Sequence, residues 1–88
     1  MKTDVRFDSP VSIALGPSKN VMVNVVSANE AAEILVTRWP DRRGPRHLEA
    51  RKIVLAALEG RLQPSDGRKA FVKAAEEADI LIDAGDRW

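Results

Sequence analysis

Residues 11–26 read VSIALGPSKNVMVNVV, and this stretch decides the fold. Apolar residues alternate with small or polar residues over 11–15, which is the period-two pattern of a half-buried strand. Residues 16–20 supply turn residues, and residues 21–26 are rich in β-branched valine. Two strands joined by a short turn predict an antiparallel hairpin. Residues 5–7 extend the first strand, with a predicted interruption at Ser9 and Pro10.

After the hairpin the apolar residues follow helical spacing. Ser27 followed by Glu30 predicts a capping box at the start of a first helix, which ends at Pro40. A second helix is predicted over residues 45–60, because proline suits the first helical position and glycine the C-terminal cap. A third helix begins near Pro64.

These elements predict a two-layer α+β fold. A hairpin needs a second layer to bury its apolar face, so we expect it to pack on the three helices. The short apolar run Ile80-Leu81-Ile82 is a candidate for a third strand at the C-terminal end. With 88 residues, the chain has the length of one small domain spanning residues 1–88.

Four residues are predicted to have structural roles: Trp39, Pro40, Leu58 and Phe71. Trp39 follows Leu35 by four residues on the apolar face of the first helix, which favours a place in the core beside residues such as Leu58. A platform on which a base or ligand stacks is the alternative for Trp39. Leu58 and Phe71 belong to the apolar stripes of the second and third helices, and Pro40 ends the first.

The composition excludes several classes of protein. No cysteine is present, which rules out disulfide frameworks, thiolate metal sites and cysteine-based catalysis. No apolar run approaches the roughly 18 residues of a membrane span, and the first six residues lack the apolar region of a signal peptide. We therefore expect a cytoplasmic protein that does not bind membranes. We expect no cofactor and no metal site, because Asp79, Asp83 and Asp86 do not match a calcium loop.

Several segments resemble a known family. They are Trp39-Pro40, Arg43-Gly44-Pro45-Arg46 and the run RKAFVKAAEEA at residues 68–78. They are similar to the family catalogued as domain of unknown function 982, which consists of short alphaproteobacterial proteins. The resemblance runs from about Val11 to Ile82 and implies no activity. Gly67 departs from the family pattern, which favours alanine there, and glycine costs about 1 kcal/mol of helix propensity.

One cluster of basic residues lies at a helix N-terminus, where positive charge is usually unfavourable. Arg42, Arg43 and Arg46 surround the predicted start of the second helix, where an exposed cation costs about 0.3–1 kcal/mol against the helix dipole. Free helix amides with arginines beside them form an anion site, to which we add His47. The favoured alternative is neutralisation within the fold by Asp41 and the acidic residues near the C-terminus.

We expect a small non-enzymatic interaction domain that binds a protein, with a homodimer through the uncovered face or edge of the hairpin as a further expectation. The alternative is a weak anion or nucleic-acid binder that uses the basic cluster. Against nucleic acid, the net charge is only +1 and aromatic residues form 5% of the chain. An enzyme that uses His47 and a carboxylate ranks last, because a lone histidine with no recognisable nucleophile gives no catalytic signature. We expect His47 at the surface or half-buried, and we predict no catalytic residue.

Overall fold

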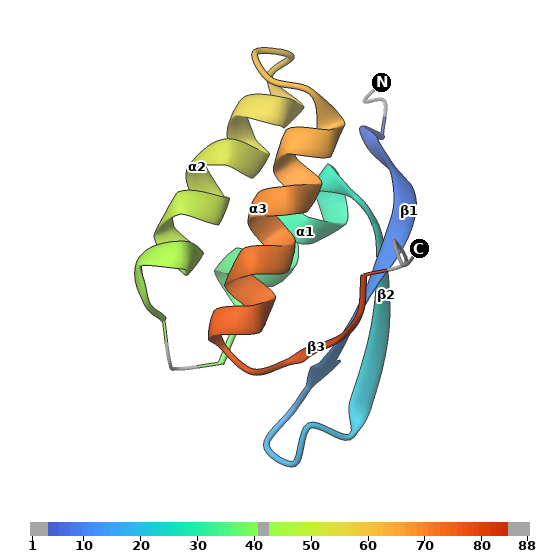
Figure 1. Cartoon of the computed structure of the whole chain (residues 1–88), viewed down its shortest axis with the longest axis vertical. Coiled ribbons are helices and arrows are strands. Elements are labelled where there is room, and N and C mark those ends of the chain that lie inside the picture. The colour runs from blue at the N-terminus through green and yellow to red at the C-terminus, as the bar shows by residue number, and fades with distance from the viewer. Residues whose placement is uncertain (1–3, 41–42, 85–88) are drawn as a thin grey trace.

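The computed structural model describes residues 4–40 and 43–84. In chain order, its elements are β1 (Arg6–Leu15), β2 (Val21–Ser27), α1 (Ala28–Thr37), α2 (Pro45–Leu58), α3 (Pro64–Glu77) and β3 (Leu81–Asp83). The strands form an antiparallel sheet in the order β2-β1-β3. The helices form a second layer on one side of the sheet (Figure 1). The predicted α+β fold is confirmed, including the short third strand.

The period-two pattern of the hairpin determines which side chains reach the helices. Val11, Ile13 and Leu15 of β1 are buried, whereas Ser12 and Ala14 between them are partly exposed. Ile13 is opposite Val23 of β2 on one side and opposite Leu81 of β3 on the other. β1 is therefore the central strand, and its apolar side chains form the floor of the core.

The predicted interruption at Ser9 and Pro10 is wrong, because β1 continues through both residues. The pairing register with β2 shifts between Arg6 and Val11, so the strand contains an irregularity instead of a break. Arg68 of α3 lies with 9% exposure beneath it. The Arg68 side chain donates from Nε to the Ser9 carbonyl oxygen at 2.9 Å and from Nη2 to that of Pro10 at 3.4 Å. A cation from a distant helix thus satisfies the carbonyl groups where regular pairing is lost.

The helix ends follow the local signals. The Ser27 hydroxyl accepts a hydrogen bond from the Glu30 amide at 3.2 Å. The Glu30 carboxylate reaches back to the Val26 amide at 3.1 Å, one residue before the position that a capping box uses. Pro45 opens α2, and Gly60 follows it with a φ of +81°, the left-handed conformation that glycine adopts most easily.

α2 and α3 approach each other closely because small residues line their contact. Ala74 and Ala75 of α3 are fully buried. Gly67, at the start of α3, lies so near α2 that an added Cβ would meet the Ala57 Cβ at 3.5 Å and the Val54 Cα at 3.7 Å. Phe71, fully buried one turn after Gly67, is the largest side chain of the core with no exposed surface.

Candidate functional site

The basic cluster predicted from the sequence is divided by the fold. Arg42 lies outside the described residues, as does Asp41. Arg43 is exposed, and its guanidinium donates to the carbonyl oxygens of Trp39 at 3.3 Å and Pro40 at 3.4 Å. Arg46 is exposed as well, and its Nη1 lies 3.7 Å from Oε1 of Glu49. The two described arginines therefore turn toward the chain's own oxygen atoms.

The N-terminus of α2 already holds a carboxylate from the same chain. Gly44, the N-cap residue, has no side chain with which to cap the helix. Oε2 of Glu77, at the end of α3, accepts a hydrogen bond from the Arg46 amide at 3.3 Å. A Cβ on Gly44 would lie 2.6 Å from that same oxygen, so the carboxylate fits against the glycine backbone. Glu77 therefore supplies the negative charge that the helix dipole and the nearby arginines favour.

The expectation of a surface or half-buried His47 is wrong, because its exposure is 3%. His47 Nε2 lies 2.8 Å from the carbonyl oxygen of Leu35. That carbonyl belongs to the last turn of α1, where helices leave carbonyl groups without an intrahelical partner. Because a carbonyl oxygen can only accept, the proton resides on Nε2. His47 thus ties the start of α2 to the end of α1.

Two of the residues predicted to be structural, Trp39 and Phe71, lie near this contact. Trp39 is 5% exposed, and its ring centroid is 5.6 Å from those of both His47 and Phe71. Trp39 Nε1 is buried with no hydrogen-bond partner in the described part of the chain. Van der Waals packing, and not a hydrogen bond from the indole, therefore holds the ring in place. Leu58 is partly buried against the core and Pro40 is partly exposed. Burial removes Trp39 from the surface on which a base or ligand would stack.

A groove between α1 and α2 is the feature that the sequence analysis missed. We call it the α1–α2 groove; its volume is about 370 Å³, and its lining residues are Ala32, Leu35, Val36, Leu48, Arg51, Lys52 and Leu55. Val36 is 56% exposed, Leu48 51% and Leu55 52%. A signal was present in the sequence, since Leu48 and Leu55 lie seven residues apart on one side of α2, outside the apolar stripe that includes Ala50 and Val54.

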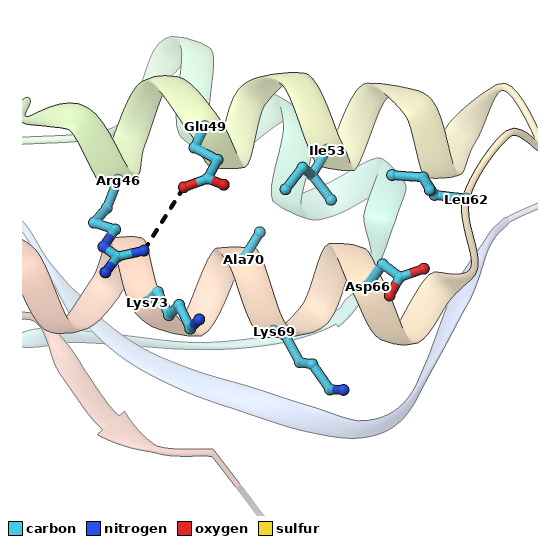
Figure 2. Close-up of a pocket in the computed structure, with 8 residues that line it drawn as sticks. All are labelled: Arg46, Glu49, Ile53, Leu62, Asp66, Lys69, Ala70 and Lys73. Carbon is cyan, nitrogen blue, oxygen red and sulfur yellow. Dashed lines mark ion pairs between the residues drawn. The ribbon is translucent and has the colours of Figure 1, made fainter.

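A second hollow lies between α2 and α3, and Figure 2 shows that charged side chains surround it. Its volume is about 270 Å³. Both signs of charge are present: Arg46, Lys69 and Lys73 are cations, and Glu49 and Asp66 are anions. Arg46 and Glu49 form an ion pair across its edge. Because cations and anions both line this hollow, its charge favours neither anionic nor cationic ligands.

The outer strand β2 presents an unprotected edge. Val21–Ser27 contains neither a charged residue nor a proline, the two features with which proteins usually block edge strands. Met22 is 65% exposed and Val21 is 45% exposed. Near the end of the strand, the Glu30 carboxylate covers one backbone group by accepting a hydrogen bond from the Val26 amide.

Two features are absent from the described residues 4–40 and 43–84. No group of three or more metal-ligating side chains is placed to hold an ion in that part of the chain. Across the same residues, the structure contains no helix with the length and apolar character needed to cross a bilayer.

Comparison with known proteins gives a family and a structural relative. The sequence profile of the family described as "Protein of unknown function (DUF982)" matches residues 9–82. An NMR structure of the Agrobacterium tumefaciens protein Atu1219 is similar, with 29% identity and a TM-score of 0.75, over 98% of this chain and 82% of that protein. Among the curated proteins, none matches the chain. Because the profile covers most of the chain, the protein belongs to the family of unknown function DUF982.

Proposed function

We propose that this protein is a small non-enzymatic interaction domain whose protein partner docks in the α1–α2 groove. The observation that carries the proposal is the gathering of Val36, Leu48 and Leu55, each more than half exposed, around the buried floor residue Leu35. Exposed aliphatic side chains around a concave surface mark sites where proteins bind partners, because docking removes apolar area from water.

The state of His47 supports a non-enzymatic role. A general base must reach a proton on the substrate, and a buried ring that already donates to Leu35 is poorly placed for that task. We propose the cytoplasm as the location, in keeping with a chain of 88 residues that contains no cysteine.

The test compares proteins captured by the tagged full-length chain and by two variants. Leu48→Asp with Leu55→Asp places charge inside the α1–α2 groove, and Leu62→Asp places one at a similarly exposed leucine outside it. A genuine partner should lose about tenfold or more in recovery with the groove variant, equivalent to about 1.4 kcal/mol, and little with the control. Circular dichroism checks that both variants fold. If the groove variant captures the same proteins at the same yield, the groove is not the docking site.

A second copy of the chain is a further partner that we propose, through the edge of β2. The uncharged run of residues 21–25 is favourable for strand addition, since its outer backbone groups can bond to another strand. Light scattering over a concentration series should show dimers that Met22→Lys weakens, because lysine on an edge strand opposes pairing. A wild-type protein that remains monomeric up to high micromolar concentration would remove this proposal.

A further inference from the structure

The α1–α2 groove carries charge of one sign. Arg51 and Lys52 are exposed in its wall, and no carboxylate lines it. Some exposed cations of the fold do have partners: Lys19 pairs with Asp79 at 3.1 Å, and Arg46 contacts Glu49. Within residues 4–40 and 43–84, Arg51 and Lys52 make no ion pair or side-chain hydrogen bond. The groove thus combines an apolar surface with two cations that the fold leaves unneutralised.

The arrangement of these residues matches a helix as the occupant. Leu48, Arg51, Lys52 and Leu55 occupy positions i, i+3, i+4 and i+7 of α2 and therefore form one stripe. That stripe is about 10 Å long, at about 1.5 Å per residue. An amphipathic helix presents aliphatic side chains at the same spacing and satisfies its own backbone groups. A strand would need a sheet edge to bond with, and both walls of this groove are helices.

We infer that the α1–α2 groove binds an acidic amphipathic helix of the partner protein. Aliphatic side chains on one face of that helix contact Val36, Leu48 and Leu55, and carboxylates at the border of that face lie beside Arg51 and Lys52. The charge complementarity sets which helices bind, since like charge against the two cations opposes docking. This inference rests on the proposed function and adds the chemistry of the partner.

The experiment uses a display library of 16-residue peptides with leucine at helical spacing and Glu, Lys, Gln or Ser in equal proportion elsewhere. Selection on the wild-type full chain should enrich peptides with a more negative net charge than the input library. Their affinity should fall about tenfold or more with Leu48→Asp. Arg51→Glu with Lys52→Glu should reverse the preference and enrich cationic peptides. Lys69→Glu with Lys73→Glu, which changes net charge equally on α3, should leave the selected peptides acidic.

The outcomes separate this inference from the proposed function. Peptides that depend on Leu48 but are neutral or cationic would overturn the acidic partner and leave the groove as a docking site. A charge preference that the α3 variant reverses equally well would also overturn it, because overall charge would then explain the selection. If no enriched peptide depends on Leu48, both the inference and the proposed function fail.

Discussion

Two neighbouring residues of α2, Val54 and Leu55, have opposite surroundings. Val54 has no exposed surface and faces α3, whereas Leu55 is 52% exposed and lines the α1–α2 groove. The inner face of α2 packs closely through alanine, valine and histidine. The outer face is exposed in the described structure and combines Leu48 and Leu55 with the cations Arg51 and Lys52. The apolar character of a side chain on α2 therefore does not by itself predict whether that side chain is buried. Substitutions on each side should show the difference.

The largest effect on stability is expected at Trp39, whose ring packs beside His47 of the inner face. Trp39→Ala should lower the free energy of unfolding by about 3–5 kcal/mol, because it leaves a cavity beside His47 and Phe71. Leu55→Ala on the outer face should change it by less than about 0.5 kcal/mol. Urea denaturation measures both. A Trp39→Ala protein that unfolds at nearly the wild-type midpoint would show that the inner face does not determine stability.

A smaller loss is expected at the N-terminus of α2. Glu77→Ala should lower the free energy of unfolding by about 0.5–2 kcal/mol, since it removes the acceptor that caps the Arg46 amide. Glu76→Ala is the matched control, because Glu76 is an exposed neighbour on the same helix. Equal losses in the two variants would mean that the tertiary cap contributes nothing beyond helix propensity.

A gain is expected where α3 meets the inner face. Gly67→Ala should raise the free energy of unfolding by about 0.5–1 kcal/mol through helix propensity. The new Cβ would lie 3.5 Å from that of Ala57, an ordinary van der Waals contact. Thermal unfolding would record the gain as a higher midpoint. A lower midpoint would show that the inner face is packed too tightly to accept one methyl group.

The smallest effect is expected for an added anion at the start of α2. Millimolar phosphate at low ionic strength should produce no localised shift at the amides of Gly44, Arg46 and His47, because the Glu77 carboxylate already lies there. Amide NMR of the wild-type chain provides the measurement. Saturable shifts confined to these three residues would instead establish the anion site that the basic cluster predicted, and weak nucleic-acid binding would become the function to pursue.

Local patterns in the sequence were sufficient to predict the elements. The alternation over residues 11–15, the Ser27 cap and the left-handed Gly60 depend on a few adjacent residues, and the structure agrees with each. The predicted break at Ser9 and Pro10 was wrong because the strand there depends on a contact that is distant in the sequence. Arg68, which supports the continuous strand there, is 59 residues away from Ser9 in the chain.

The candidate site was less predictable, because burial is a property of the assembled fold. Periodicity predicts one apolar stripe on α2, whereas Leu48 and Leu55 lie outside that stripe and are about half exposed. The sequence predicts His47 at the surface or half-buried. In the structure it lies on the inner face of α2, where the last turn of α1 offers it a carbonyl group.

By itself, the sequence determined the hairpin, the three helices and the family, since these depend on local spacing, caps and turn residues. Tertiary structure alone decided that Glu77 caps α2 from 31 residues away and that His47 binds the carbonyl of Leu35. It also left Leu48 and Leu55 about half exposed. The physical reason is that a long-range contact depends on how the helices and the sheet pack together. Local sequence forms each helix but does not specify which of its faces the other elements bury.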